Sequence, residues 1–318
     1  MRAGWCSNSW RVHTKQQPSR DNGIVRTWND PEAGDLLTVR PQVAARPRWR
    51  RFTSRARRGL YRLATFADNV AHWNSDVILP PAHLRIYYYG TWNPKAFARA
   101  CELARTELVT RGLRPEHRVL DIGSGIGNLA LGLVGYLRGG FDGVEIHPEA
   151  VAWCQRAITP RHPTFRFHRA DLASRAYNPR GKLPASAYRF PFPDKTFDFI
   201  LLASVFTHML PDAVEHYVHE IGRLLAPGGA CVAGYFLLND ETRTGVEAGR
   251  SFMSFGVDHP SGLCRLHDGT IPEAAVALEE TFVRRINEQA GLCVRDLRRG
   301  RWWSGVAHEQ DVLTVGPC

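Results

Sequence analysis

The sequence lacks several features that would place a chain in a membrane, secreted or metal-binding class. Its 318 residues contain no uninterrupted apolar run of about 18, the length that a membrane-spanning helix requires. The first residues, MRAGWCSNSW, do not contain the apolar stretch of a secretory signal. The seven cysteines form no C-x-x-C pair and no Cys/His ligand pattern, which argues against a disulfide framework and a zinc site. These absences predict a cytoplasmic protein with reduced thiols and no metal centre.

Acidic side chains are scarce in only one part of the sequence. Residues 1–62 hold 14 of the 41 basic side chains and 4 of the 31 acidic ones, which accounts for the whole net charge of +10. The other 27 basic and 27 acidic side chains balance. A neutral body disfavours a large surface that follows the phosphates of a nucleic acid, so nucleic acid is an unlikely partner.

The basic N-terminal part divides into two segments. Residues 1–45 show no regular period and predict an irregular or disordered tail. Residues 46–82 predict an amphipathic helix and a linker, because one helical stripe carries Trp49, Phe52, Ala56, Leu60, Leu63, Phe66 and Val70. The arginines of 46–62 could contact an anionic membrane surface or a nucleic acid. The interpretation we favour is that the stripe packs on the folded domain and the arginines stay solvated.

Strand and helix patterns alternate in the remaining domain, residues 83–318. Strands are predicted at HRVLDI, FDGVEI, TFRFHRAD, FDFILLAS and ACVAGYFLL, and helices at 126–138, 147–158 and 211–225, the last closed by Gly228 in a left-handed cap. This alternation predicts a parallel, doubly wound α/β sheet. A polar, Gly-rich insertion at 239–272 is too long for a plain connection and is expected to be a loop over the active site. A helix at 273–289 and strands near 293–299 and 309–315 should follow.

A glycine-rich turn follows the first of these strands in VLDIGSGIGNLALGL. Glycines allow the backbone to turn sharply and to approach a ligand closely, and the next helix offers free N–H groups. A dinucleotide fingerprint needs G-x-G-x-x-G, but the third position of that pattern here is Asn128. The glycines instead stand at Gly123, Gly125 and Gly127.

The order of several motifs resembles a known family. D-x-G-x-G-x-G is followed by GVE, RAD and LLAPGG, each beside a predicted strand. Over about residues 83–316 the chain resembles the class I S-adenosylmethionine-dependent methyltransferases, and within them a bacterial subfamily of mostly undefined acceptor. The resemblance implies a Rossmann-like, mostly parallel seven-stranded sheet with an antiparallel last strand, helices on both faces, and an N-terminal helical extension.

The resemblance also implies roles for residues at the ends of the strands. The cofactor, S-adenosylmethionine, would lie against the turn formed by Gly123, Ser124, Gly125 and Gly127, with Asp121 near its methionine end. Glu145 would accept hydrogen bonds from both ribose hydroxyls. Asp171 would accept from the adenine amine, Leu172 would contact the ring, and Ala203 and Ser204 would border the sulfonium.

The methyl acceptor is less constrained than the cofactor. His208 is a candidate general base for a hydroxyl acceptor, although it could instead cap a helix or contact the cofactor. His83 and Tyr87–Tyr89 precede the sheet in a segment that often covers the cofactor in such enzymes, or they are aromatic packing. We expect the acceptor between the insertion and residues 87–92.

Three absences bear on the acceptor class. The segment ASVFTH replaces both the N/D-P-P-Y/F motif of amine-directed DNA methyltransferases and the Pro-Cys of pyrimidine C5 methyltransferases, and no acid-rich loop like that of arginine methyltransferases occurs there. The sequence therefore predicts O-methylation of a small molecule or sugar. The alternatives are a nucleic-acid or protein methyltransferase that uses the basic segment, and a non-catalytic cofactor-binding subunit. The sequence leaves the oligomeric state open.

Overall fold

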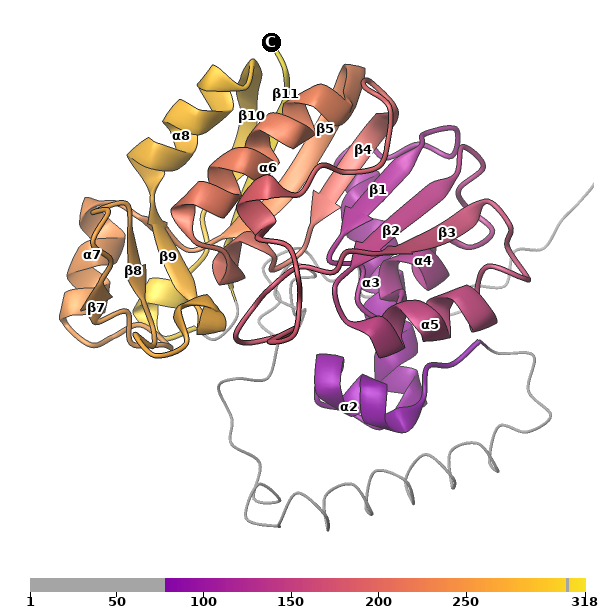
Figure 1. The fold of residues 1–318 in the computed structure, drawn as a ribbon, viewed down its shortest axis with the longest axis horizontal. Coiled ribbons are helices and arrows are strands. Elements are labelled where there is room, and N and C mark those ends of the chain that lie inside the picture. The colour runs from indigo at the N-terminus through magenta and orange to yellow at the C-terminus, as the bar shows by residue number, and fades with distance from the viewer. Residues whose placement is uncertain (1–77, 307–308) are drawn as a thin grey trace, which may run out of the picture. The chain divides into compact units, whose positions relative to one another are not determined.

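A seven-stranded sheet forms the centre of the protein (Figure 1). The computed structural model describes residues 78–306 and 309–318, so the expected tail and the helix at 46–73 lie outside the described residues. The strand order is β10-β11-β5-β4-β1-β2-β3. The strands span β1 Val119–Ile122, β2 Phe141–Glu145, β3 Phe165–Arg169, β4 Phe197–Leu202, β5 Leu225–Tyr235, β10 Leu292–Arg298 and β11 Asp311–Pro317. Strands β1 to β5 pair in parallel, and β11 runs antiparallel to both β5 and β10, which confirms the predicted fold class.

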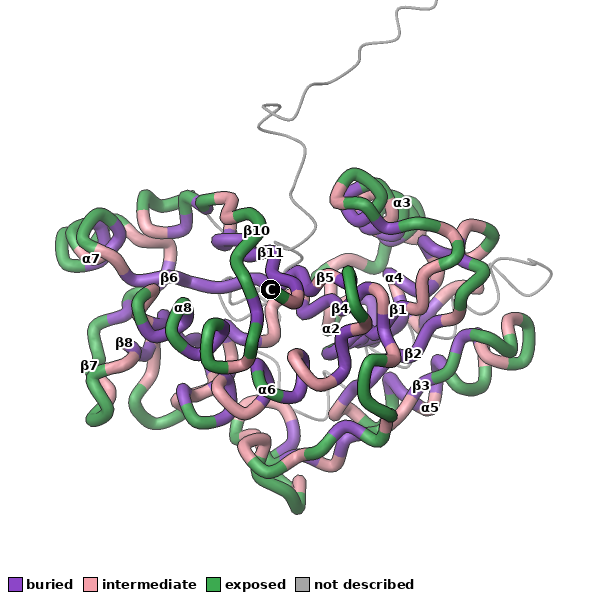
Figure 2. The backbone as a smooth tube through the Cα atoms, turned by 90° about the horizontal axis from the view of Figure 1, so that it is seen from above, coloured by how far each residue is buried: buried purple, intermediate pink, exposed green. Residues whose placement is uncertain are grey.

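Helices cover both faces of this sheet, and each face has its own core. One core joins Phe199 and Leu201 of β4 to α3 Pro94–Thr110, α4 Asn128–Leu133 and α5 Pro148–Ala157. The other joins Ile200 and Leu202 to α6 Pro211–Leu224 and α8 Glu280–Gln289. Successive side chains of a strand point to opposite faces, so a strand covered on both sides must be apolar throughout. Figure 2 shows this burial through the centre of the sheet.

Two predicted helix ends differ from the structure. The helix expected at 126–138 is only α4, because Val134 is extended and Gly135 takes a φ of 79°, which ends the helical path. Helix α6 ends at Leu224, and Leu225 already belongs to β5. Gly228 has the predicted left-handed conformation, with φ 79°, but it lies inside β5 where the pairing with β4 is irregular. The prediction that Gly228 caps α6 is therefore wrong.

The segment after β5 forms a second sheet, where a loop was expected. It contains β6 Leu237–Leu238, α7 Asp240–Glu247, β7 Val257–Asp258, β8 Cys264–Leu266, η5 Pro272–Ala274 and β9 Val276–Glu279, with strand order β6-β9-β8-β7. The predicted fifth strand therefore stops at Tyr235, and the predicted helix at 273–289 begins only at Glu280. These strands have two to four residues each, too few for a clear alternation of polar and apolar side chains.

A small third core attaches the second sheet to the first. Phe236, Phe255 and Trp302 pack against one another, and Trp302 belongs to η6 Trp302–Ser304. The buried carboxylate of Asp311, the first residue of β11, accepts hydrogen bonds from the N–H groups of Leu237 and Gly300 and from the Trp302 indole. One carboxylate therefore joins β11 of the first sheet to Leu237 in β6 of the second.

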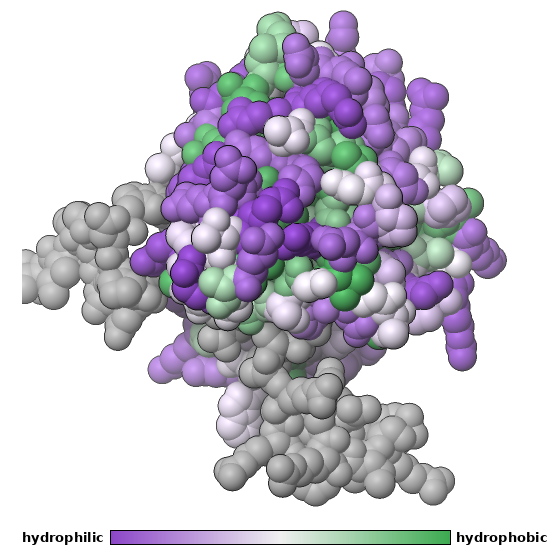
Figure 3. Space-filling model, turned by 90° about the vertical axis from the view of Figure 1, so that its left-hand side faces the viewer, coloured by the Kyte–Doolittle hydropathy of each residue, from purple (hydrophilic) through white to green (hydrophobic). Residues whose placement is uncertain are grey.

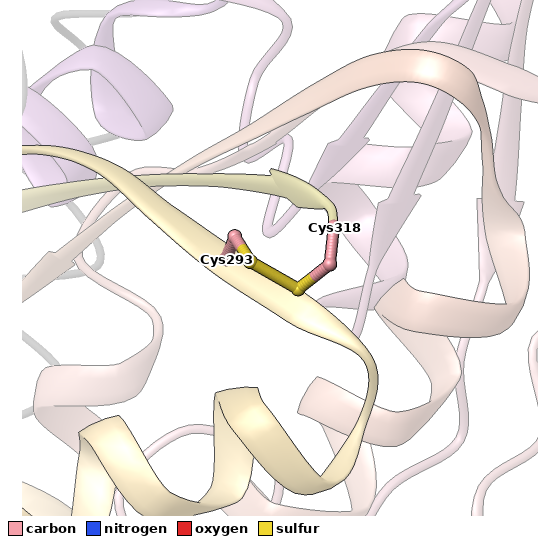
Figure 4. The surroundings of a disulfide bond; sticks show 2 residues. All are labelled: Cys293 and Cys318. Carbon is pink, nitrogen blue, oxygen red and sulfur yellow. A yellow bond between two sulfur atoms is a disulfide. The ribbon is translucent and has the colours of Figure 1, made fainter.

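The cysteines differ in part from the expectation of reduced thiols. Cys293 in β10 and Cys318, directly after β11, form a disulfide with Cα atoms 4.9 Å apart (Figure 4). The two residues lie at the end of one antiparallel pair, where Cys293 is opposite Gly316, so their side chains meet although 25 positions separate them. Four more cysteines are free and buried: Cys101, Cys154, Cys231 and Cys264. Spacing in the sequence could not indicate this pair.

Two features are absent from the described residues. No helix among them is both long and apolar enough to cross a membrane. Within the same part of the chain, no three His, Cys, Asp or Glu side chains are grouped so that they could hold a metal ion.

Candidate functional site

The glycine turn between β1 and α4 is the centre of the candidate site. Gly123, Gly125 and Gly127 have φ angles of 80°, 52° and 74°, a backbone region that other residues rarely adopt. The N–H groups of Gly123 and Ser124 donate to the carbonyl of Val144, which fixes the turn against β2. A Cβ on Gly127 would lie 2.8 Å from Ile158, so the third glycine allows α4 to pack closely on α5. The spacing therefore reflects both backbone conformation and close packing.

Glu145 ends β2 beside this turn and is held by two backbone hydrogen bonds. Its Oε2 accepts from Gly125 N and its Oε1 from His147 N, each at 2.8 Å. A carboxylate oxygen can accept two hydrogen bonds, so each oxygen keeps one position for a ligand donor. Burial raises the pKa of Glu145, and the backbone N–H groups oppose that shift. The structure thus provides a fixed pair of acceptors in the place predicted to bind the ribose hydroxyls.

Asp121 and Ser124 are buried polar groups at the same edge. Burial, and then the charge of Glu145, raise the pKa of Asp121 to about 8. The Ser124 hydroxyl is buried with no hydrogen-bond partner among the described residues. Buried polar groups are normally paired, so the Ser124 hydroxyl is available to a ligand donor or acceptor. A cationic group beside Asp121 would lower its pKa again, which suits the methionine ammonium of the predicted cofactor.

Asp171 and Leu172 follow β3, as predicted. Asp171 is half-buried, and its Oδ1 accepts from Arg169 Nη2 at 2.9 Å and Asn178 Nδ2 at 3.3 Å. Leu172 is buried and pairs with Leu183 in an isolated bridge. One carboxylate oxygen of Asp171 is therefore already engaged, and contact with an adenine amine stays a prediction for the other.

The segment directly after β4 packs against the glycine turn. Ser204 has a φ of 55°, and its hydroxyl accepts from Gln310 Nε2 at 2.8 Å. Such a conformation is strained for a serine and is typical of functional turns. A Cβ on Gly123 would lie 2.5 Å from Val205 Cγ2, so the residues after β4 lie directly against the turn after β1. Val205 therefore lies against Gly123, and contact of Ala203 and Ser204 with the sulfonium stays a prediction.

Helix α2, Ala82–Tyr89, brings aromatic rings to the site. The ring of Tyr88 lies over Gly125, where a Cβ would be 3.1 Å away, and Tyr87 and Tyr88 both pack against His147. Burial, and then the charge of Glu145, raise the pKa of Tyr87 and Tyr88. Tyr89 packs on Phe97 instead, as the aromatic-packing interpretation expects, and a cover over the cofactor stays a prediction for the other two tyrosines. His147 was missed, although its place directly before the Pro148 helix start was a usable signal.

His208 lies in η4, Phe206–His208, and contacts two residues that sequence reasoning missed. Its Nδ1 is 3.0 Å from the carbonyl oxygen of Glu273, which can only accept, so Nδ1 donates and Nε2 is left as an acceptor. The Tyr177 hydroxyl is 3.2 Å from both ring nitrogens. Burial lowers the pKa of His208 to about 4, against the opposing effect of the Glu273 hydrogen bond. His208 is thus a neutral imidazole held between Tyr177, in the loop after β3, and Glu273 of η5. No motif in the sequence indicates these two contacts.

Comparisons with known proteins agree with this arrangement. Residues 120–233, from β1 to β5, match the model of the methyltransferase domain family. The chain is 30% identical over 156 residues to 27-O-demethylrifamycin SV methyltransferase of Amycolatopsis mediterranei, a match that covers 48% of this chain and 51% of that protein. It is 29% identical over 163 residues to an uncharacterized methyltransferase of Schizosaccharomyces pombe, covering 44% and 55%. The chain therefore spans about half the length of the curated relatives it matches.

Solved structures of low sequence identity are also similar to the chain. One is Burkholderia thailandensis 1,6-didemethyltoxoflavin-N1-methyltransferase with bound 1,6-didemethyltoxoflavin and S-adenosylhomocysteine. Its TM-score is 0.43 and its identity is 18%, over 83% of this chain and 90% of that chain.

The family match and the strand order agree on the fold of the central part of the chain. The glycine turn, the acid at the end of β2 and the segment after β4 all fall within the matched residues 120–233. The matched strands pair in parallel, and β11 adds the antiparallel strand that the resemblance implied. Residues 120–233 are thus similar to the methyltransferase domain family, and the cofactor that this match supports is S-adenosylmethionine.

Proposed function

We propose that the protein transfers a methyl group from S-adenosylmethionine to a hydroxyl of a small molecule or sugar. The observation that carries this proposal is the neutral His208 beside Tyr177, in the segment that follows β4. A hydroxyl is a poor nucleophile until a base removes its proton, whereas an amine needs no such base. A half-buried neutral imidazole whose Nε2 can accept a proton suits a hydroxyl acceptor best.

The cofactor would be held mainly by backbone groups and acids. The turn Gly123–Gly127 would approach the methionine part, with Asp121 and the unpaired Ser124 hydroxyl next to it. Glu145 would use its two remaining lone-pair positions on the ribose hydroxyls. Asp171 and Leu172 would contact the adenine, and Ala203 and Ser204 would border the sulfur. These assignments fit because each residue either faces the turn or follows a strand at the same sheet edge.

The residues beside the methyl acceptor would remove the proton from its hydroxyl. S-adenosylmethionine supplies a methyl group on a positively charged sulfur, which is a good leaving group. His208 would take the hydroxyl proton on Nε2 while Nδ1 stays hydrogen-bonded to the Glu273 carbonyl. Burial raises the pKa of Tyr177, so Tyr177 would remain protonated and orient the acceptor or pass the proton on. The main contribution of the protein would be to position the reactants.

A relative supports the acceptor class. The name of the Amycolatopsis protein describes methyl transfer to an oxygen of a small molecule, and that protein shares 30% identity with this chain. The alternatives that depend on the basic segment concern residues 46–62, which lie outside the described part. The remaining alternative, a non-catalytic cofactor-binding subunit, is separated from an enzyme by the experiment below.

Transfer of a labelled methyl group tests the proposal directly. The protein is incubated with methyl-labelled S-adenosylmethionine and with separate small-molecule, glycan, RNA and protein fractions. We expect label in small molecules or glycans, as an alkali-stable ether, and little or none with His208→Gln. Label only in RNA or protein would overturn the acceptor class. Cofactor binding without transfer to any fraction would indicate a non-catalytic subunit.

The pH dependence tests the role of His208. A base must be neutral to act, and the lowered pKa keeps His208 neutral down to about pH 4. The single-turnover rate should therefore stay level between pH 8 and pH 6 and fall only as the pH approaches 4. A rate that halves near pH 6.5, the usual histidine value, would contradict this role.

A further inference from the structure

A pocket lies between the insertion after β5, the end of β9 and the start of α8. It has a volume of about 510 Å³ and is formed by α7, the β7–β8 hairpin, the end of β9 and the first turns of α8. None of its lining residues belongs to the ends of β1, β2 or β4, so it is separate from the candidate site above. The face that carries α7 and β7, seen in Figure 3, is largely hydrophilic with smaller apolar areas between the polar ones.

Three arginines line this pocket, and two of them use only part of their donors. Nη2 of Arg243 donates to both carboxylate oxygens of Glu279, at 2.7 and 2.8 Å. Arg265 donates through Nε to Asp258 and through Nη2 to Glu247. A guanidinium has five N–H donors, so each arginine keeps donors that these acids do not take. The two acids that Arg265 contacts are 81% and 56% exposed, so water weakens both ion pairs.

The third arginine has no acidic partner within the described residues. Arg285 lies over the Phe282 ring, with its guanidinium carbon 5.7 Å from the ring centre. The acids Glu279, Asp258 and Glu247 pair with Arg243 and Arg265, so the positive charge of Arg285 is the one that no acid of the described residues pairs with. This is the charge that an anion would meet on entering.

A histidine adds one more donor. His259 Nδ1 accepts from the backbone N–H of Ser261, and a backbone N–H can only donate. The ring proton of neutral His259 therefore lies on Nε2. The pocket also has an apolar part, formed by Leu263, Cys264 and Phe282. Unused N–H donors and apolar side chains in one pocket favour a ligand with acceptor oxygens and a hydrocarbon body.

We propose that this pocket binds a small organic anion that carries a carboxylate or phosphate group. Only an acceptor-rich anion can satisfy several guanidinium donors at once, and charge-assisted hydrogen bonds of this kind are the strong ones. The volume is within the range of about 300–1,000 Å³ that small-molecule sites occupy. Arg285 provides the uncompensated charge, and Phe282 and Leu263 contact the apolar part of the ligand.

Calorimetry with three probes tests the pocket. Phenyl phosphate and phenylacetate represent the two anionic classes, and phenol is the neutral control. We expect the wild-type protein to bind at least one of the anions and not phenol. The anion that binds more tightly identifies the class. Equal binding of phenol, or binding of none of the three at low ionic strength, would overturn the proposal.

Neighbouring arginines of α8 provide matched variants. Arg285→Gln should weaken anion binding about tenfold, the effect of one charge-assisted interaction. Arg284→Gln removes the same charge one residue earlier, but Arg284 pairs with Glu280 and does not line the pocket, so binding should stay unchanged. Equal losses in both variants would mean that only general surface charge attracts the anion. Unchanged S-adenosylmethionine binding in both variants would confirm that the fold and the cofactor site are intact.

Discussion

The two sheets of this protein differ in how their sequences specify them. The central strands of the seven-stranded sheet, β1, β2 and β4, are buried along nearly their whole length, and local motifs mark their ends. The four-stranded sheet contains strands of two to four residues, and both residues of β7 are exposed. The first sheet is stabilised mainly by its own apolar burial. The second depends on contacts with its surroundings, among them Asp311 and Trp302.

Replacing Asp311 should cause the largest loss of stability, because it removes contacts on which the second sheet depends. Asp311→Ala leaves three buried N–H donors without an acceptor, on Leu237, Gly300 and Trp302. An unsatisfied buried donor costs about 1–3 kcal/mol, so we expect a loss of about 3–5 kcal/mol in the free energy of unfolding. Denaturant titration measures it. The control is Asp296→Ala in β10, whose carboxylate is 60% exposed and lies 3.4 Å from Arg111, and a change within about 0.5 kcal/mol is expected there.

The first sheet could be predicted from the sequence for a physical reason. Strands such as FDFILLAS are apolar throughout, and the spacing of Gly123, Gly125 and Gly127 reflects a local backbone requirement. The second sheet gave no such signal because its pairing joins β6 to β9 across about forty residues. Tyr177 and Glu273 approach His208 from separate loops, and only the tertiary fold brings them together.

Two neighbouring acids of the first sheet should respond to pH in opposite ways. Burial, and then the charge of Glu145, raise the pKa of Asp121 to about 8, so the folded protein keeps a proton that the unfolded chain loses above about pH 4. Its ionisation therefore lowers stability as the pH rises from 4 to 8. Asp121→Asn removes this cost. The gain in unfolding free energy over wild type should be on the order of 2 kcal/mol larger at pH 9 than at pH 4.

Asp142 in β2 is the control for this effect. Burial raises its pKa, but hydrogen bonds from His168 and Arg118 outweigh burial and leave the pKa below its usual value. Its contribution to stability is present above about pH 4 and is lost as the pH falls through the lowered pKa. Asp142→Asn should therefore destabilise the protein at neutral pH, and the deficit should shrink in acid. The same pH trend in both variants would contradict the assignment.

Two glycine substitutions test whether the glycine turn needs glycine for ligand binding as well as for its backbone conformation. Gly125→Ala introduces a Cβ 3.1 Å from the Tyr88 ring at a φ of 52°, so backbone strain and a steric contact add together. Gly135→Ala introduces the same strain at a φ of 79° with no atom within 4 Å. We expect losses of about 1–2 kcal/mol for Gly125→Ala and about 1 kcal/mol for Gly135→Ala. Only Gly125→Ala should weaken S-adenosylmethionine binding, and an equal loss in both would remove Gly125 from the site.

The smallest expected effects come from removing two helix caps, one beside each sheet. Asn239 caps α7 in the second sheet: its side chain accepts from Thr242 N, and the Thr242 hydroxyl accepts from Asn239 N. Asn93 caps α3 beside the first sheet by accepting from Lys95 N. Replacing either asparagine by alanine should cost about 1 kcal/mol locally.

Hydrogen exchange shows where that cost appears. If the second sheet opens as a unit of its own, Asn239→Ala should speed exchange about fivefold at the amides of α7, β8 and β9, and leave β1 and β4 unchanged. Asn93→Ala should leave β8 and β9 unchanged. Faster exchange of β4 in the Asn239→Ala protein would mean that the two sheets open together, because coupling through Asp311 and Trp302 would then be strong enough to make them one cooperative unit.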